Sequence, residues 1–556
     1  MSIQYFVEGK VKYDIKGDYK TFSKDNIVNN STQEVQQKGV NTGVIYSNPD
    51  TIDENDTPND TIDVSLNVFF DGTSNNKTNT ESRLTNNTEY NKKSNKDDDS
   101  YMNDFTNIAR GYDAIDPNAD KQAVVYIEGI GTVDGKSDTM PFISAVPNNI
   151  GGGLGEGDRG VQAKVTKGCI ESARTLKRKF EKRKINVLKI NVYGFSRGAT
   201  AARHFVHVVL SATPYIYKNN GSITVYPPAY YDISTKEKAP KLIIQLNNLS
   251  EEQQAILDAY GYFGACLIKE DVSIKKIVFN FVGLYDTVAS FGLNHRGTSI
   301  LGVDIVDDDA KQLNLDAIKQ AYFTLQIASD DEFRENFSLT NINSTGLNGL
   351  EFTLPGVHSD IGGSYIDGER EDRQIYKGYK SECEKFKKIL EDEGWYTKGE
   401  LEVNLLEKMI LKKMDTYELR GTRKLSNQYD KIPLQQMFHY SKQFEVIYDD
   451  VILTNKEKIN NEEIKTVYTH LAFYMNKCNQ IREKYVKEYN SGNTVNTAQY
   501  IKDIKQISYL SDLPIDVLKN LRNKYLHWSV SDKIGMGPNT DEVTSFDKRK
   551  RYILQG

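Results

Sequence analysis

One pentapeptide, G-x-S-x-G at 194–198, constrains this chain more than any other feature. It follows an apolar run at 185–192 that predicts a strand, and it precedes a segment at 197–210 that predicts a helix. A serine between a strand and a helix lies on a tight turn, and only residues with almost no side chain fit beside it. Glycine meets that demand because it tolerates crowded or left-handed backbone. We therefore predict a nucleophile elbow with Ser196 at its tip, the alternative being a purely structural glycine turn.

Two more chemically informative residues each follow a predicted strand. Asp286 comes after the apolar run 274–284, and His358 comes after 350–354. The carboxyl ends of parallel strands meet at one edge of a sheet, where open α/β sheets place their active crevice. The chain order serine, acid, histidine is the order of the triad in α/β-hydrolases. We predict that Ser196, Asp286 and His358 form a catalytic triad, although an aspartate in this place could also cap the segment that follows it.

Ester hydrolysis by such a triad also needs donors for the oxyanion. The neutral imidazole takes the serine proton, the carboxylate orients the imidazole, and two N–H groups stabilise the tetrahedral oxygen. The predicted donors are the backbone N–H of Arg197 and an N–H of Gly72 or Thr73, in the loop after the strand at 64–70. We expect Asp71 to support that loop through hydrogen bonds to backbone N–H groups, not to bind a metal.

The remaining histidines define the alternatives to His358. His527 lies near a late segment that could form a strand, and it is the main alternative. His295 follows Asp286 by only nine residues, which is a poor order for a triad. Asp360 is a candidate supporting residue, cap or second acid. The other histidines are expected to be packing or surface residues: His204, His207, His439 and His470.

Composition excludes several other classes of function. The net charge is −6, and the short basic run at 177–184 reads as a solvated helix end, so nucleic acid is not the expected partner. The four cysteines are far apart and form no metal-type pair, which indicates reduced thiols and synthesis in the cytoplasm. We expect no metal and no cofactor. The N-terminus lacks a basic region followed by an apolar one, so no cleavable secretion signal is expected, and no apolar run is long enough to span a bilayer.

Strands that alternate with helices predict an α/β fold of the α/β-hydrolase type, with a mostly parallel sheet and helices on both faces. A stretch rich in Asn, Asp and Lys at 74–104 predicts a surface loop that buries little, and a helix is expected at about 308–332. The glycine-rich stretch at 151–160 lacks the ending of a phosphate-binding loop, so we interpret it as a substrate-site or hinge loop.

We divide the chain into five parts by composition. A small N-terminal module at 1–46, a candidate for a role in secretion, is followed by a linker at 47–62. The catalytic core covers 63–370 and has an insertion at about 212–272. A mainly helical cap or accessory region follows at 371–525, and a C-terminal segment at 526–556 is expected to return to the core.

Four sequence blocks in order carry a resemblance: FFDGTSNN at 69–76, YGFSRGA at 193–199, VGLYDTV at 282–288 and LPGVHSDIGGSY at 354–365. The chain resembles a family of uncharacterised bacterial α/β-hydrolases that includes the first family of type VI secretion lipase effectors. A further block at 327–339 is similar to another segment of that family. The resemblance covers about 62–370 and places the family's triad roles on Ser196, Asp286 and His358.

The resemblance implies a phospholipase or related lipid esterase that a contractile secretion machine delivers into rival bacteria. It implies three partners: membrane phospholipid as substrate, a spike or tube protein of the secretion apparatus, and a neutralising immunity protein in the producing cell. Two alternatives stay open at this stage. One is a soluble carboxylesterase that acts on small or polysaccharide esters, and the other is a catalytically silent binding protein on a hydrolase fold.

Overall fold

The computed structural model describes residues 61–92, 98–138, 159–181, 183–212, 216–219, 221–228, 241–289, 313–407, 415–530, 537, 549 and 551–556. All of them belong to one compact unit, Thr61–Gly556. The predicted N-terminal module at 1–46, nearly all of the linker at 47–62 and most of the glycine-rich stretch at 151–160 lie outside the described residues, as does His295.

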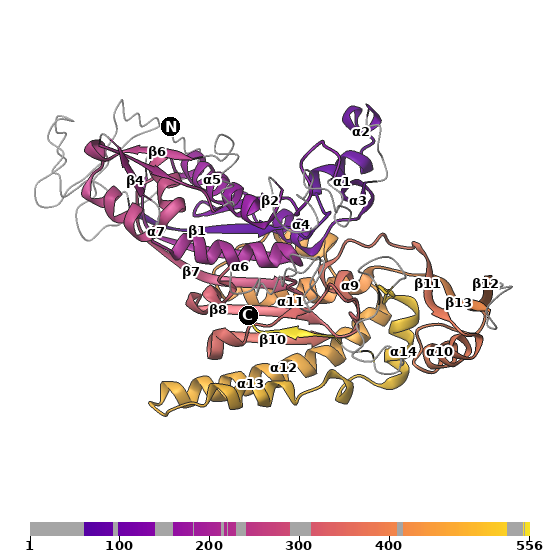
Figure 1. The fold of residues 1–556 in the computed structure, drawn as a ribbon. Helices are drawn as coiled ribbons and strands as arrows, with labels where there is room; N and C mark the ends of the chain where they lie inside the picture. The colour runs from indigo at the N-terminus through magenta and orange to yellow at the C-terminus, as the bar shows by residue number, and fades with distance from the viewer. Residues whose placement is uncertain are drawn as a thin grey trace, which may run out of the picture. The chain divides into compact units, whose positions relative to one another are not determined.

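A six-stranded parallel sheet forms the centre of this unit (Figure 1). Its strands are β1 (Thr61–Phe70), β2 (Gln122–Ile127), β3 (Lys184–Phe195), β7 (Ile274–Tyr285), β8 (Phe323–Ser329) and β10 (Gly349–Leu354). They lie in the order β10-β8-β7-β3-β1-β2, and each neighbouring pair is parallel. The expected α/β fold is confirmed, and the parallel order brings the carboxyl ends of all these strands to one edge.

Side chains of the central strands alternate between two hydrophobic cores, one on each face of the sheet. In β3, Leu188, Ile190 and Val192 belong to the core under α5 (Val161–Phe180), α6 (Arg197–Leu210) and α7 (Glu251–Lys269). The alternate residues Tyr193 and Phe195 belong to the core on the opposite face. This period of two is what the pleat of a strand dictates.

The opposite face is covered by helices from both ends of the unit. They are α4 (Asn107–Ala114), α11 (Lys431–Lys442) and α12 (Glu462–Asn490). Aromatic rings line this face across neighbouring strands, with Phe69 stacked on Tyr193 at 4.3 Å between ring centroids. Figure 1 shows α12 and α13 (Thr497–Lys505) lying beyond β10.

Two small antiparallel sheets flank the central one. The predicted insertion at 212–272 contains β4 (Ile216–Asn219), β5 (Ser222–Val225) and β6 (Leu242–Gln245), followed by α7. The region 371–525 contains α10 (Lys380–Asp392) and α14 (Ile515–Lys524) besides α11–α13. It also contains a sheet, although the sequence predicted a mainly helical region. The strands of this sheet are β11 (Arg370–Gly378), β12 (Leu401–Glu407) and β13 (Thr416–Lys424).

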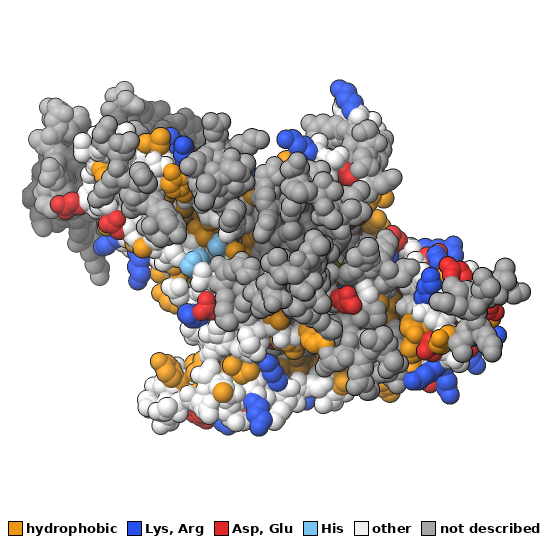
Figure 2. All heavy atoms as spheres, in the orientation of Figure 1, with side chains coloured by type: hydrophobic (Ala, Val, Ile, Leu, Met, Phe, Trp, Pro, Cys, Tyr) orange, Lys and Arg blue, Asp and Glu red, His pale blue; other side chains and the backbone are white. Residues whose placement is uncertain are grey.

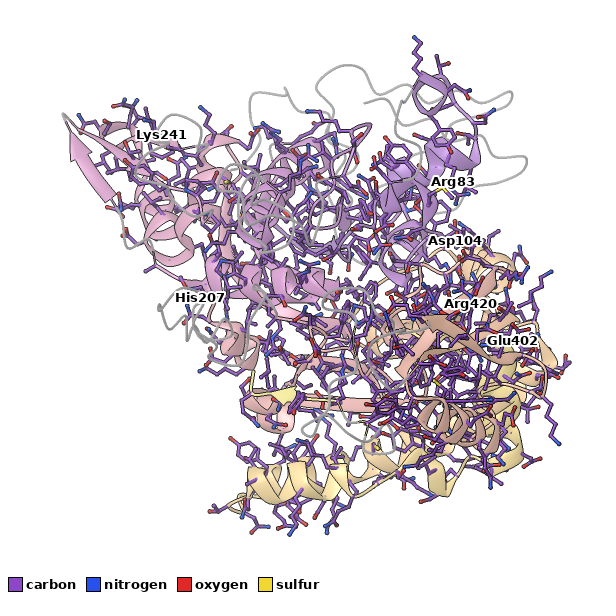
Figure 3. All side chains as sticks on the ribbon, turned by 45° about the vertical axis from the view of Figure 1, so that its right-hand side comes forward. Arg83, Asp104, His207, Lys241, Glu402 and Arg420 are labelled. Carbon is purple, nitrogen blue, oxygen red and sulfur yellow. The ribbon has the colours of Figure 1, made fainter. Side chains whose placement is uncertain are left out.

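Acidic and basic side chains are interspersed on this second small sheet. Glu402 on β12 lies opposite Arg420 on β13, and both are labelled in Figure 3. Arg420 Nε also donates to Asp372 Oδ1 at 2.7 Å. Red and blue side chains mingle over this part of the molecule in Figure 2. Such exposed pairs contribute at most about 1 kcal/mol each to folding stability.

The expected surface loop at 74–104 is wrong for the residues described there. They form α1 (Lys77–Leu84), α2 (Thr88–Lys92) and α3 (Asp99–Met102). Asn79 is fully buried, because its Nδ2 donates to Ser100 Oγ at 3.0 Å and its Oδ1 accepts from the Gly135 N–H at 2.8 Å. Polar side chains that satisfy one another in this way can be buried without an apolar pattern in the sequence.

The expected helix at 308–332 is also wrong. Its described part consists of a short 3₁₀ helix, η4 (Leu315–Gln320), and the strand β8. Every residue of β8 is buried between β7 and β10, and its sequence FTLQIAS alternates the apolar residues Phe323, Leu325 and Ile327 with Thr324 and Gln326. This alternation has the period of two of a strand, and it lies within the longer segment for which a helix was expected.

Candidate active site

Ser196 occupies the turn between β3 and α6 in a strained backbone conformation. Its φ is 58° and its ψ is −129°, a region that non-glycine residues rarely adopt and that costs about 1–3 kcal/mol. A Cβ atom on Gly198 would collide with the carbonyl oxygen of Asp71, and one on Gly194 would collide with the backbone of Ala199. The two glycines of the pentapeptide are therefore required by close backbone approach. Strain of this kind is typical of a nucleophile elbow.

The backbone of Ser196 is tied to the segment that carries the predicted acid. Its N–H donates to the Tyr285 carbonyl at 3.1 Å, and its carbonyl accepts from the Val288 N–H at 3.3 Å. Thr200 Oγ1 on α6 also donates to the Val288 carbonyl, at 2.8 Å. Asp286 lies between Tyr285 and Val288, so the segments that carry the serine and the acid hold each other in place.

Asp286 and His358 form a buried hydrogen-bonded pair. His358 is the first residue of the short helix α9 (His358–Gly362), which follows β10, and its Nδ1 lies 2.5 Å from Asp286 Oδ2. The backbone N–H of His358 donates to Glu332 Oε2 at 3.1 Å. The other ring nitrogen, Nε2, is buried and has no hydrogen-bond partner among the described residues. The His358 ring lies against Phe195, the neighbour of Ser196, at 4.6 Å between centroids.

The surroundings keep the imidazole neutral and the carboxylate ionised. Burial lowers the pKa of His358 below its usual value, although the hydrogen bond from its ring to Asp286 opposes that shift. Burial alone would raise the pKa of Asp286, but the charge of Arg551 and the hydrogen bond from His358 outweigh it, and the pKa lies well below its usual value. A neutral imidazole is the form that can accept a proton.

Sequence reasoning missed two residues that contact the Asp286 carboxylate. Ser329, at the end of β8, donates through its backbone N–H at 2.8 Å and through its hydroxyl at 3.0 Å. Arg551 donates through both terminal guanidinium nitrogens. Ser329 lies within the block at 327–339, whose similarity to a family segment could have pointed to it. No local sequence pattern indicates a role for Arg551.

The predicted oxyanion loop, with Gly72 and Thr73, follows β1, the neighbour of β3 in the sheet. Asp71 supports it from within, accepting from the Gly72 N–H at 2.7 Å, from Thr106 Oγ1 at 2.7 Å and from the Tyr126 hydroxyl at 2.6 Å. Burial raises the pKa of Asp71 to about 6 despite these hydrogen bonds. The hydroxyl of Thr73 is buried without a hydrogen-bond partner among the described residues.

Arg197 is the first residue of α6, next to Ser196. Its side chain is buried, and burial lowers the pKa of its guanidinium to about 10. The backbone N–H of a residue at this position points along the start of the helix, where N–H groups lack partners within the helix. This geometry suits the donor role that the sequence predicts.

His527, the main alternative to His358, lies in a second pair of its own. Its Nδ1 lies 2.7 Å from Asp360 Oδ1, and the Tyr365 ring stacks on it at 3.5 Å between centroids. Asp360 Oδ2 accepts from the backbone N–H groups of His527 and Val357, so it links the C-terminal region to the start of α9.

The helical histidines near the nucleophile have other contacts. His204 Nδ1 lies 2.9 Å from the Leu313 carbonyl, and His207 lies near the far end of α6 from Ser196 (Figure 3). Within the described ranges, no group of three or more His, Cys, Asp or Glu side chains is placed to hold a metal ion. None of the described helices is both long and apolar enough to span a membrane.

The parallel sheet and the serine turn after β3 define an α/β protein of the hydrolase type. A family model, described as the T6SS phospholipase effector Tle1-like catalytic domain, matches residues 65–381, more than half of the chain. The chain therefore belongs to the Tle1-like phospholipase effectors of type VI secretion. This membership confirms the resemblance seen in the four sequence blocks and supports the role of a phospholipase effector.

The solved structures that are similar to the chain include the following two. One is titled the structure of the Tle1 effector bound to the VgrG spike from the type 6 secretion system, with 19% identity, a TM-score of 0.46 and 85% of each chain covered. The other is a crystal structure of an uncharacterized protein from Pseudomonas aeruginosa, with 16% identity and a TM-score of 0.33. That match covers 79% of this chain and 52% of the other. No curated protein matches the chain.

Proposed function

We propose that this protein hydrolyses carboxylic ester bonds of phospholipids through an acyl-enzyme on Ser196. One observation carries the proposal: a buried Asp286–His358 pair lies beside the strained turn that holds the serine. Family membership supports phospholipid as the substrate class. Phospholipase A chemistry, with cleavage of an acyl ester, is the reaction that a serine nucleophile would perform on such a substrate.

Acylation begins when Ser196 Oγ attacks the acyl carbonyl carbon and His358 Nε2 takes the hydroxyl proton. The negative charge then lies on the former carbonyl oxygen, which accepts hydrogen bonds from the backbone N–H groups of Arg197 and Thr73. Of the two donors predicted in the loop after β1, Thr73 is the better candidate, because the Gly72 N–H already donates to Asp71 Oδ1 at 2.7 Å. When the carbon–oxygen bond to the alcohol breaks, His358 returns the proton to the leaving lysophospholipid oxygen. Asp286 stabilises the imidazolium between these two events.

Deacylation repeats the sequence with water as the nucleophile. His358 takes a proton from the water as its oxygen attacks the acyl carbon, and Ser196 Oγ then leaves and regains that proton. The products are a fatty acid and a lysophospholipid. None of these steps calls for a metal or a cofactor.

The decisive variant is Ser196→Ala. It removes the nucleophile and leaves the backbone of the elbow unchanged, so we expect loss of phospholipid turnover and of labelling by a fluorophosphonate probe. Ser211→Ala is the matched control, because Ser211 follows the other end of α6 and its hydroxyl donates to the His207 carbonyl. Retained hydrolysis by Ser196→Ala would refute the proposal.

The same assay separates the alternatives. Lipid analysis of vesicles treated with wild type or with Ser196→Ala identifies the ester that is cleaved. Hydrolysis of short-chain esters without hydrolysis of vesicles would favour the soluble carboxylesterase. Absence of both activities, with an unlabelled Ser196, would favour the silent binding protein.

Family membership also motivates proposals about export and partners. We infer that the protein is made in the producing cell's cytoplasm, is loaded on a spike or tube protein of the type VI apparatus, and is neutralised there by an immunity protein. In this proposal residues 1–46 serve secretion and 63–370 carry the chemistry. The insertion at 212–272 and the region 371–525 shape an apolar groove that holds the acyl chains of the substrate. Deleting residues 1–60 should then block export and spare hydrolysis, and normal export of the truncated protein would contradict this assignment.

A further inference from the structure

The last described residues run along the catalytic edge of the sheet. The strand β14 (Ile553–Leu554) pairs in parallel with β9 (Leu339–Thr340), a short strand that follows β8 in the chain. The Leu339 N–H donates to the Tyr552 carbonyl at 2.9 Å, and the Asn341 N–H donates to the Leu554 carbonyl at 3.0 Å. This pairing fixes the backbone on the C-terminal side of Arg551, and it thereby carries that side chain to Asp286.

Arg551 forms a bidentate ion pair with the carboxylate of Asp286. Its Nη1 donates to Oδ1 at 2.5 Å and its Nη2 donates to Oδ2 at 2.8 Å. The remaining N–H groups contact Ser329 and the carbonyl of Phe337. The Asp286 side chain is 0% exposed and that of Arg551 is 6% exposed. A fork of two parallel hydrogen bonds fixes the plane of a carboxylate as well as its position.

We propose that Arg551 is a positioning residue for the catalytic acid, which holds the Asp286 carboxylate in the plane where Oδ2 faces His358 Nδ1. This inference rests on the triad of the proposed function. Oδ2 receives His358, Ser329 and Arg551 together, so the direction of the hydrogen bond to the imidazole depends on the other two donors. Without Arg551, the supports of the carboxylate other than His358 would be the two hydrogen bonds from Ser329, at the end of β8. Arg551 adds a second support from the segment before β14.

Arg551 also changes the charge that His358 experiences. The charged groups near the imidazole are Asp286, at the end of β7, and Glu332 and Arg334, between β8 and β9, with Arg551 behind the acid. Arg334 Nε donates to Glu332 Oε1 at 2.7 Å, and those two charges offset each other. The Arg551 guanidinium therefore balances the acid. Removing it leaves Asp286 as an unbalanced anion, which favours the imidazolium.

Two variants separate orientation from charge. Arg551→Gln removes the positive charge and the fork, and Arg551→Lys keeps the charge and loses the fork. The control is Arg420→Gln, which breaks an ion pair with Asp372 in which both side chains are 41% exposed. The measurement is the pH profile of kcat/KM on a short-chain ester with the full chain, with Ser196→Ala in parallel.

We expect Arg551→Gln to lower the plateau of kcat/KM about tenfold to a hundredfold, because a displaced acid misplaces the base. The acidic limb of the pH profile, where kcat/KM rises as His358 loses its proton, should move up by about one pH unit, because an unbalanced anion favours the protonated imidazole. Arg551→Lys should leave the limb in place and recover part of the rate. The control should match wild type.

A purely structural role predicts a different result, since loss of folded protein lowers the rate equally at every pH. An unchanged limb and plateau in Arg551→Gln, with Ser196→Ala inactive, would overturn this inference and leave the proposed function intact. An active Ser196→Ala would overturn the proposed function itself. If Arg551→Gln does not fold, Arg551→Lys decides the question, with kcat/KM expressed per folded molecule. A wild-type value refutes the positioning role, and a lower value supports it.

Discussion

Replacing Asp286 with asparagine tests the buried charge arrangement most directly. Oδ1 accepts from the Ser329 N–H and from Arg551, and Oδ2 accepts from His358, from the Ser329 hydroxyl and from Arg551. An amide has one acceptor oxygen, so in either orientation its NH₂ group faces at least two donors. Asp286→Asn therefore breaks the ion pair with Arg551 and misdirects the imidazole at once.

Both consequences have an expected size. Leaving one partner of a buried ion pair without its counter-charge costs about 3–5 kcal/mol, and the 0% and 6% exposed side chains here allow little relief from solvent. Loss of the carboxylate that holds a catalytic histidine lowers kcat by about four orders of magnitude in serine hydrolases with this triad. Asp286→Asn should therefore show a lower free energy of unfolding and nearly complete loss of kcat.

The assay pairs denaturant unfolding with ester hydrolysis per folded molecule. Ser329→Ala is the graded control, because it removes the hydroxyl contact at 3.0 Å and keeps the backbone N–H contact. A hydrogen bond to a charged group contributes about 1.5–3 kcal/mol, so this control should lose about that much. If Asp286→Asn kept its stability and stayed within tenfold of the wild-type kcat, both the ion-pair argument and the triad would be refuted.

Three further predictions concern pH, backbone packing and a buried amide. Because burial lowers the pKa of His358, wild-type kcat/KM should rise with pH and reach half of its plateau below pH 6.5, the usual pKa; a midpoint above that value would contradict the burial argument. Gly198→Ala should cost about 1–3 kcal/mol of folding stability and most of the activity, because its Cβ meets the Asp71 carbonyl oxygen; a variant with the melting temperature and activity of wild type would show that the elbow is less tight. Asn79→Ala should cost about 1–3 kcal/mol, since it leaves the Gly135 N–H without its acceptor, while hydrolysis per folded molecule stays unchanged; an unmoved urea midpoint would refute this account.

The parts of the fold that follow local rules were predictable. The helix predicted at 197–210 has the same bounds as α6, and the run at 274–284 differs from β7 by one residue. The turn that carries Ser196 between them could be predicted from the two glycines of the pentapeptide, because a tight turn needs residues without side chains. Periodicity and turn chemistry act over short distances, so a sequence displays them.

The missing parts depend on long-range contacts. Arg551 and Asp286 are 265 positions apart, and no local pattern links them. The buried amide of Asn79 requires Ser100 and Gly135 as partners, so its neighbours in the chain resemble an exposed loop. The strand β8 buries the polar side chain of Gln326, which is possible because the Thr340 carbonyl, in a strand outside β8, accepts from its Nε2 at 3.1 Å.

The hydrogen bonds between Ser196 and the segment around Asp286 have a mechanical consequence. The Ser196 N–H and carbonyl are both engaged by the residues that flank the acid, so a displacement of one segment drags the other. These hydrogen bonds therefore couple the position of the nucleophile to that of the acid at the ends of β3 and β7. His358 lies on a five-residue helix after β10 and is joined to the acid through a side-chain hydrogen bond. In the proposed reaction, a shift of α9 would therefore change the position of the base before it changed the distance between the serine and the acid.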